Sequence, residues 1–352
     1  MTVDARHGTP LPTWQEMTDA QRDRWAAVLE TLAAAVPAGA AGVVVDGRGA
    51  EVVADRLADF LRPSGRRCLR LSDDNPMGDE DTWRIEGTPD AVALADGPRW
   101  HAQPPAGAWD LVIWLRVREY QPNQENSGDA DVVLDLADPS WPVIRRIHPR
   151  VTAPASWYIT ESRAFFAPRA ATWDKKFGDD LPAYAAAVAE LGPARGAVAL
   201  DLGCGTGRAL PSLREAVGPA GTVIALDLTA HMLEATRAAD RARHAALLLA
   251  DAHHLPLADA CVDAVFAAGL VNHLHDARAG LAESARVTRV SGRLAIFHPS
   301  GRAALAARHG RTLRPDEPLA EHRLRRALAE TGWALDSYDD SPHRFLALAT
   351  RT

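Results

Sequence analysis

The sequence predicts an α/β protein of two domains, each built on a largely parallel sheet. In the second half of the chain, short apolar runs alternate with helix-compatible stretches, and each run ends in a glycine or polar turn. A similar alternation runs through residues 38–148, and a Pro-rich stretch at 148–154 separates the two halves. A length of 352 residues with 47% hydrophobic content supports two cores of ordinary size.

The first half opens with an amphipathic helix over residues 13–35. Thr18 is its expected N-cap, and Pro37 ends it. Its apolar positions at helical spacing are Trp25, Val28, Leu29 and Leu32. Strands are then predicted at residues 41–46, 69–74, 92–97, 109–115 and 130–135. We expect these elements to form one domain over residues 1–150.

Residues 41–57, Ala-Gly-Val-Val-Val-Asp-Gly-Arg-Gly-Ala-Glu-Val-Val-Ala-Asp-Arg-Leu, resemble the first strand, loop and helix of uridine kinase-like P-loop proteins. A working P-loop surrounds phosphates with backbone amides, a lysine and a hydroxyl. Here the loop is short, Glu51 stands near the lysine position, and residues 1–150 contain no lysine. A carboxylate at that place repels phosphate. The domain is therefore expected to be a degenerate kinase fold that serves as a scaffold, a substrate wall or a homo-oligomer surface.

The most informative stretch lies in the second half, at residues 198–207, Val-Ala-Leu-Asp-Leu-Gly-Cys-Gly-Thr-Gly. An apolar run ends in Asp201, turns through three glycines and enters residues 208–217, which suit a helix. Glycines there let the backbone bend sharply and approach a ligand closely. A strand, a glycine turn and a helix start form the crevice in which α/β sheets bind nucleotides.

Four further apolar runs follow at consistent spacing. Residues 222–226 end in Asp227, 20 residues past Gly207, where a nucleotide-binding unit places a carboxylate for the ribose hydroxyls. Thr229 is the expected cap of the helix that comes next. The remaining runs are 245–250, ending in Asp251 and Ala252; 261–268, ending in Gly269 and Leu270; and 293–297, ending in His298.

Together these motifs resemble a class I S-adenosylmethionine-dependent methyltransferase of the small-molecule, quinone-biosynthesis type, over about residues 165–352. The resemblance implies a seven-stranded Rossmann-like domain over 181–352, with S-adenosylmethionine as cofactor and S-adenosylhomocysteine as product. The dinucleotide-binding domain of a dehydrogenase shares the first glycine turn, but the run at 245–250 and the segment 283–297 argue against it. The implied cofactor residues are Asp201, Gly203, Cys204, Gly205 and Gly207 at the methionine end, Asp227 at the ribose, Leu228, Met232, Asp251 and Ala252 at the adenine, and Gly269 and Leu270 under the sulfonium.

In methyltransferases of this type the segment ahead of the first strand covers the cofactor as a lid, so residues 151–180 are expected to be linker and lid. A sulfonium cation is attracted to π-faces, which suits the aromatic content of this segment. Trp173 is therefore expected at the cofactor, and Tyr158 and Phe166 at the substrate. The alternative is that these aromatic residues pack the two domains together. Lys176 either pairs with the cofactor carboxylate or is solvated.

Methyl transfer by in-line attack needs mainly proximity, and a base matters only for an acceptor that arrives protonated. Candidate bases at the strand ends are His298 and His273, with His275 ranked below them, because imidazole titrates near neutrality. The alternative for His273 and His275 is a helix-start or solvent position. His253 and His254 are expected at the surface, and no metal site is expected.

A net charge of −7 disfavours nucleic acids as partners, and three scattered cysteines form neither a metal spacing nor a disulfide framework. Without a signal-peptide pattern or an apolar stretch of membrane-spanning length, a cytoplasmic protein without membrane contact is expected. The sequence thus predicts a methyltransferase that acts on a small organic acceptor. Two alternatives stay open: an enzyme that uses the bound sulfonium electrostatically for another reaction, and a non-catalytic, cofactor-sensing protein.

Overall fold

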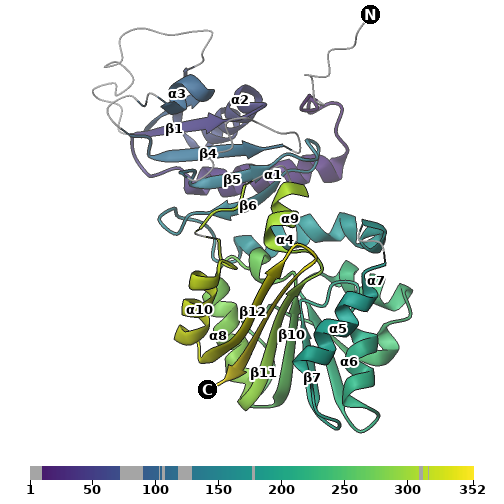
Figure 1. Cartoon of the computed structure of the whole chain (residues 1–352). Coiled ribbons are helices and arrows are strands. Elements are labelled where there is room, and N and C mark those ends of the chain that lie inside the picture. The colour runs from purple at the N-terminus through teal and green to yellow at the C-terminus, as the bar shows by residue number, and fades with distance from the viewer. Residues whose placement is uncertain are drawn as a thin grey trace, which may run out of the picture. The chain divides into compact units, whose positions relative to one another are not determined.

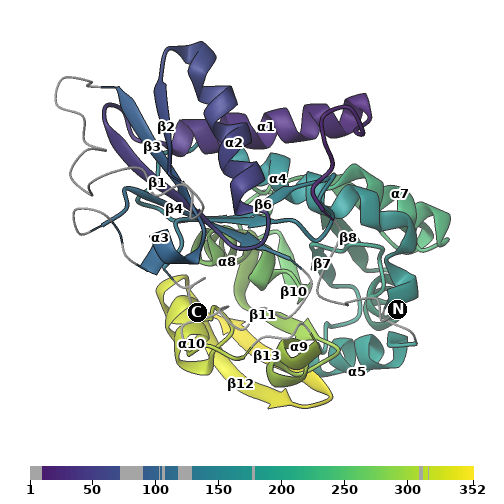
Figure 2. The ribbon, with the colours of Figure 1, turned by 90° about the horizontal axis from the view of Figure 1, so that it is seen from above.

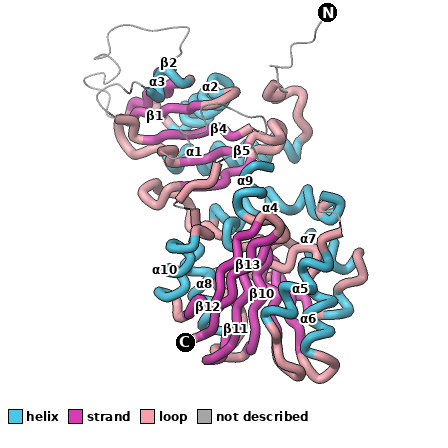
Figure 3. The backbone as a smooth tube through the Cα atoms, in the orientation of Figure 1, coloured by secondary structure: helices cyan, strands magenta, loops and turns pink. Residues whose placement is uncertain are grey.

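A computed structural model describes residues 10–71, 90–102, 104, 108–117, 129–176, 179–308, 312–315 and 317–352. The chain divides into two compact units, Met1–Glu161 and Ser162–Thr352. In both units helices and strands alternate along the chain (Figures 1 and 3). The division falls inside helix α4 (Trp157–Phe166), within the stretch that the sequence assigns to linker and lid.

The first unit contains a six-stranded sheet in the order β2-β3-β1-β4-β5-β6. Figure 2 shows its first four strands side by side. Neighbouring strands run parallel except β6, which is antiparallel to β5, so the carboxyl ends of the parallel strands meet at one edge. The strands are β1 (Ala41–Asp46), β2 (Arg67–Leu71), β3 (Ala91–Asp96), β4 (Leu111–Arg116), β5 (Val132–Asp135) and β6 (Val143–Ile147).

Helices α1 (Asp19–Ala35) and α2 (Ala50–Leu61) bury their apolar residues against one face of this sheet. The short helix η1 (Arg62–Ser64) follows α2, and Trp100 of α3 (Pro98–Ala102) packs against the apolar cluster of the other face. Thr18 caps α1 as expected: its hydroxyl accepts from Gln21 N at 3.3 Å, and Thr18 N donates to Gln21 Oε1 at 2.8 Å. The expected start at residue 13 is wrong, because this capping box begins the helix at Asp19.

The second unit contains a seven-stranded sheet in the order β12-β13-β11-β10-β7-β8-β9. Only β13 runs antiparallel to its neighbours, so the ends of β7, β8, β9, β10 and β11 share one edge. The strands are β7 (Val198–Leu202), β8 (Thr222–Asp227), β9 (Ala246–Leu249), β10 (Val262–Ala268), β11 (Thr288–His298), β12 (Trp333–Ser341) and β13 (Arg344–Arg351).

Helices cover both faces of this sheet (Figure 1). One face carries α5 (Leu181–Leu191), α6 (Leu210–Val217) and α7 (Ala230–Ala238), and the other carries α8 (Ala277–Val287) and α10 (Glu321–Glu330). Each helix buries an apolar stripe against the strands, which is the usual way in which an α/β sheet forms its core. The remaining helices are η4 (Ala167–Thr172), η5 (Asp174–Lys176), η6 (Ala242–His244), η7 (Val271–His273) and α9 (Arg302–Arg308).

Thr229 occupies the N-cap position of α7, but it does not cap the helix as expected. Its hydroxyl makes no hydrogen bond to the helix, and the buried Oγ1 has no partner among the residues the structure describes. Thr229 N instead donates to Asp227 Oδ1 at 2.8 Å. The carboxylate that ends β8 thus fixes the chain where α7 begins.

Candidate active site

The glycine turn after β7 is held against β8 by two backbone hydrogen bonds. Gly203 N and Cys204 N both donate to Leu226 O, at 2.8 and 2.9 Å. Gly203 has φ +72° and packs closely, because a Cβ at this position would lie 2.8 Å from Leu270 Cδ1. Gly205 has φ +55°, and a Cβ there would have no heavy atom within 4 Å. The turn is therefore closed at its first glycine and open at Gly205.

Asp201 lies beside this turn, near the end of β7, and is 1% exposed. Burial and the charge of Asp227 raise the pKa of Asp201 to about 8. Its Oδ2 is buried and has no hydrogen-bond partner among the described residues. A buried carboxyl oxygen without a partner is costly unless a ligand completes it. The arrangement suits a cationic group that enters at the open side of the turn.

Asp227 ends β8 and is oriented by the same turn. Its Oδ2 accepts from Gly205 N at 2.9 Å, and burial raises its pKa. Two of the four residues expected at the adenine follow this carboxylate in the chain: Leu228, directly after it, is half-buried, and Met232 of α7 is buried. Two neighbouring strands thus end in acidic residues that meet at one glycine turn.

The loop after β9 places a carboxylate and a histidine together. His253 N and Nδ1 approach Asp251 Oδ1 at 3.0 and 2.8 Å, and the His253 ring lies 4.3 Å from that of His275. The expected surface position of His253 is wrong, because Asp251 and His275 enclose it and leave it 6% exposed. His254 is exposed as expected, and Ala252 is buried. Burial and the charge of His253 lower the pKa of His275.

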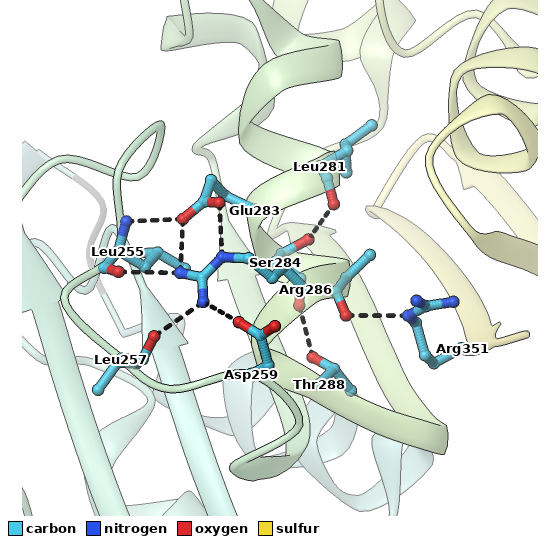
Figure 4. Close-up of polar contacts among 10 residues, drawn as sticks. Leu255, Leu257, Asp259, Leu281, Glu283, Ser284, Arg286, Thr288 and Arg351 are labelled. Atoms are coloured by element: carbon cyan, nitrogen blue, oxygen red, sulfur yellow. Dashed lines mark hydrogen bonds and ion pairs between the residues drawn. The ribbon is translucent and has the colours of Figure 1, made fainter.

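Arg286 of α8 holds the rest of this loop (Figure 4). Its guanidinium donates to the carbonyls of Leu255 and Leu257 at 3.0 and 2.9 Å, to Asp259 at 2.6 Å, and twice to Glu283 at 2.8 and 2.9 Å. These five bonds match the five N–H groups of an arginine. Glu283 Oε2 also accepts from Leu255 N at 2.9 Å, so the loop is fastened at both backbone and side chain. Our sequence analysis missed this network, although the i, i+3 spacing of Glu283 and Arg286 is visible in the sequence.

The end of β10 meets aromatic residues from α4 and the segment after it. The ring of His273 in η7 lies 5.1 Å from Phe166 and 6.1 Å from Phe165. Phe166 in turn lies 5.6 Å from Trp173 in an edge-to-face arrangement. The structure therefore brings together three predicted site residues, His273, Phe166 and Trp173.

His298, the second candidate base, ends β11. Its Nδ1 lies 3.0 Å from Ser300 N and 2.9 Å from Ser300 O, which fixes the ring. Its Cδ2 lies 3.9 Å from the position that a Cβ on Gly269 would take. His298 and Gly269 are therefore neighbours at the ends of two adjacent strands.

The remaining predicted residues are Tyr158, Lys176 and Cys204. Tyr158 is buried and belongs to the first unit. The Lys176 side chain lies outside the part of the chain that the structure describes. Cys204 is buried, and burial raises the pKa of its thiol well above the ordinary value. Within the described residues, no group of three or more His, Cys, Asp or Glu side chains is arranged to hold a metal ion. None of the described helices has the length and apolar character needed to cross a bilayer.

Comparison with known proteins gives matches over this same region. Residues 200–296 match the model of a methyltransferase domain. An uncharacterized 37.1 kDa protein in transposon TN4556 of Streptomyces fradiae is 40% identical over 105 residues, which is 30% of either chain. The demethylmenaquinone methyltransferase of Lactobacillus johnsonii is 34% identical over 132 residues, covering 36% of this chain and 50% of the relative. A SAM-dependent methyltransferase from Aquifex aeolicus aligns in three dimensions with a TM-score of 0.43 at 24% identity, covering 52% of this chain and 98% of that chain.

The chain therefore spans between 30% and 50% of the length of these curated relatives. The family match lies entirely within the second unit, from β7 to β11. Within the second unit, residues 200–296 thus match a methyltransferase domain, a class of domain whose cofactor is S-adenosylmethionine.

Proposed function

We propose that the protein transfers a methyl group from S-adenosylmethionine to a small organic acceptor. The observation that carries this proposal is the buried Asp201, whose Oδ2 lacks a hydrogen-bond partner, beside the open face of the turn at Gly205. The methionine end of the cofactor bears an ammonium and a sulfonium, and a carboxyl in a low-dielectric site favours such a cation. The residues therefore fit the cofactor.

We propose that an acidic residue at or after the end of each of three strands binds one part of the cofactor. Asp201 and the glycine turn would hold the methionine end, Asp227 the ribose hydroxyls, and Asp251 the adenine. The carboxylates of Asp227 and Asp251 are already oriented, by Gly205 N and by His253. Preorganised acceptors of this kind lose little entropy on binding, which favours affinity.

The bound cofactor supplies an activated methyl group on sulfur. The chain's own contribution is to align the acceptor and, where the acceptor is a phenol or an enol, to remove its proton. His298 is the proposed base: with its Nδ1–H donating to Ser300 O, the lone pair that accepts a proton is on Nε2, and the ring lies next to Gly269. His273 is the second candidate, and its ring packs beside those of Phe165 and Phe166. The aromatic rings of Phe166 and Trp173 are proposed to exclude water from the side of the site where the sulfonium binds.

We further propose that residues 1–150 are a degenerate P-loop domain that does not bind nucleotide. Gly47 N, which would face a phosphate, donates to Asp46 Oδ1 at 2.6 Å, and His101 Nδ1 lies 2.6 Å from Asp46 Oδ2. A Cβ at Gly49 would collide with the side chain of Leu11, so the N-terminal segment covers the loop. The Gly47 amide is thus already hydrogen-bonded, and Leu11 occupies the space beside Gly49. We propose that this domain serves as a scaffold or a homo-oligomer surface. It is followed by a proposed linker and lid at residues 151–180 and a proposed methyltransferase domain at residues 181–352.

Tritium transfer tests the proposed reaction. The purified chain is incubated with methyl-labelled S-adenosylmethionine and a panel of phenolic, amine and carboxylic acceptors, and S-adenosylhomocysteine is quantified. One S-adenosylhomocysteine for each methylated product supports methyl transfer. Conversion of an acceptor without S-adenosylhomocysteine would instead identify a reaction that uses the sulfonium only electrostatically. The three free cysteines, Cys68, Cys204 and Cys261, are consistent with a proposed cytoplasmic location.

A further inference from the structure

Asp174 is an acidic residue of the segment between α4 and α5 that our sequence analysis did not single out. It begins η5 and directly follows Trp173. Its Oδ1 accepts from Thr206 Oγ1 at 2.5 Å and lies 3.1 Å from Arg208 Nη1. Its Oδ2 accepts from Arg241 Nη1 at 2.7 Å. Both oxygens of one carboxylate are thus engaged by residues in or next to the glycine turn.

The partners of Asp174 are themselves fixed. Thr206 is the residue between the last two glycines of the turn and is 3% exposed. Arg241 Nη1 also donates to Thr206 O at 2.9 Å, so a single arginine contacts the lid carboxylate and the turn backbone. The Arg208 side chain is 6% exposed and also pairs with Asp180. Side chains held in this way present a preformed receptor for a carboxylate.

The electrostatic balance at Asp174 favours the charged form. Partial burial raises its pKa, but the hydrogen bonds from Thr206 and Arg241 and the charge of Arg241 lower the pKa by more. The net pKa therefore lies below the ordinary value for an aspartate. Asp174 is therefore ionised at neutral pH, where it accepts from Thr206 and Arg241.

The other end of the same segment is anchored differently. Trp173 lies edge-to-face with Phe166, and Phe166 lies against His273 at the end of β10. The segment from Phe166 to Asp174 thus runs from the end of β10 to the glycine turn after β7. These two strands are direct neighbours in the sheet. The segment is thus anchored at the ends of two neighbouring strands, and η4 between these anchors packs against α7, the helix that follows Asp227.

We propose that Asp174 is a positioning residue that latches the aromatic lid, residues 165–174, to the glycine turn and so holds Trp173 and Phe166 at the methionine end of the cofactor site. The proposal deepens the function proposed above and rests on it only for the effect on ligand binding. Asp174 itself touches neither the reacting methyl nor the acceptor. It acts through Thr206, Arg208 and Arg241.

The test compares Asp174→Asn with Asp179→Asn. Asn keeps the shape of Asp174 but loses the charge, and its amide nitrogen opposes the donors of Arg241. Asp179 is an exposed aspartate close by with no ion pair among the described residues, so it serves as the matched control. Hydrogen exchange followed by mass spectrometry reports on the lid without any ligand, and calorimetric titration with S-adenosylhomocysteine reports on the site.

In Asp174→Asn we expect amides of residues 167–174 to exchange at least tenfold faster, and the affinity for S-adenosylhomocysteine to fall about tenfold. We expect neither change in Asp179→Asn. A double-mutant cycle with Arg241→Gln should show that the two substitutions are not additive, because they break the same contact.

Unchanged exchange in Asp174→Asn would overturn the latch, and tighter binding of S-adenosylhomocysteine would overturn its positioning role. If the wild type binds no S-adenosylhomocysteine, the proposed function fails, while the exchange experiment still decides whether Asp174 holds the lid.

Discussion

Asp201 and Asp227 lie on neighbouring strands, and both are buried next to one glycine turn. Two carboxyl groups this close resist ionising together, which is why the charge of Asp227 adds to burial in raising the pKa of Asp201 to about 8. The pair is destabilising in the ligand-free protein at neutral pH. A bound cationic cofactor would reduce the repulsion between the two carboxylates. The residues proposed to bind the cofactor are therefore the same ones that destabilise the ligand-free protein.

We predict that Asp201→Asn flattens the pH dependence of stability. The raised pKa means that folded wild type binds more protons than the unfolded chain between about pH 4 and 8, so its free energy of unfolding falls as pH rises through this window. The slope contributed by one such group reaches about 1.4 kcal/mol per pH unit. Urea unfolding of the wild type and of Asp201→Asn at pH 5, 6, 7 and 8 measures this slope. Parallel pH profiles for the two proteins would contradict the assignment.

A second prediction concerns Gly205, the open position of the turn. Gly205→Ala places a methyl group where the cofactor is proposed to lie, so affinity for S-adenosylhomocysteine should fall at least tenfold. Gly196→Ala is the matched control, because Gly196 also has positive φ, +82°, and no atom within 4 Å of a Cβ. Both substitutions should cost about 1 kcal/mol of stability through left-handed backbone strain. Equal affinity in both variants would contradict the proposed cofactor position.

At the residue scale, the sequence predicts those site residues that directly follow an apolar run or belong to a short motif. Asp201, Asp227 and the glycines follow apolar runs at fixed spacing, so their meeting at one sheet edge could be predicted. His253 could not, because nothing in a loop sequence tells whether a histidine folds back onto the acid two residues before it. Asp174 could not either, since its partners Thr206 and Arg241 lie far along the chain.

Among the elements, the loop after β9 shows how a site is supported from outside. Arg286 of α8 donates three of its five guanidinium hydrogen bonds to residues 255–259, which begin four residues after Asp251, and the other two to Glu283 of the same helix. The bidentate contact with Glu283 gives this support a defined geometry. The position of the Asp251 carboxylate therefore depends on a helix that contributes no residue to the proposed cofactor site.

We predict that Arg286→Gln lowers the free energy of unfolding by about 1–3 kcal/mol, because several charge-assisted hydrogen bonds are lost. The side chain is one-third exposed, which places the value toward the lower end. Arg289→Gln, which removes a half-exposed ion pair with Asp263, should cost less than about 1 kcal/mol. Urea denaturation of the two variants and the wild type measures both losses in the free energy of unfolding. Equal losses in the two variants would show that Arg286 is an ordinary surface arginine.

The elements themselves were largely predictable. The apolar runs at 41–46, 222–226 and 261–268 became buried strands, because their alternation with helical stretches leaves few other folds. β6 was missed, since Val143–Ile147 contains two arginines and only its first two residues are buried. β11 begins at Thr288 rather than 293, because the chain passes through Ser291, which has a left-handed φ of +67°, without leaving the strand.

At the scale of the whole molecule, the two units make different use of the same edge of a parallel sheet. In the second unit the turn after β7 is open at Gly205 and bordered by an unsatisfied carboxyl. In the first unit the turn after β1 is covered by Leu11, and its Gly47 amide is taken by Asp46. The sequence predicts only a short loop without a phosphate-binding lysine and with Glu51 near its place. The covering by Leu11 depends on a long-range contact that no local pattern reveals.

The most direct measurement is calorimetric titration of the full chain with S-adenosylmethionine, S-adenosylhomocysteine and ATP, with Asp227→Ala and the surface variant Asp179→Ala in parallel. Our account predicts micromolar binding of both sulfur ligands to the wild type and to Asp179→Ala, loss of that binding in Asp227→Ala, and no signal with ATP. Binding of ATP without the sulfur ligands would contradict it, because the active site would then lie in the first unit.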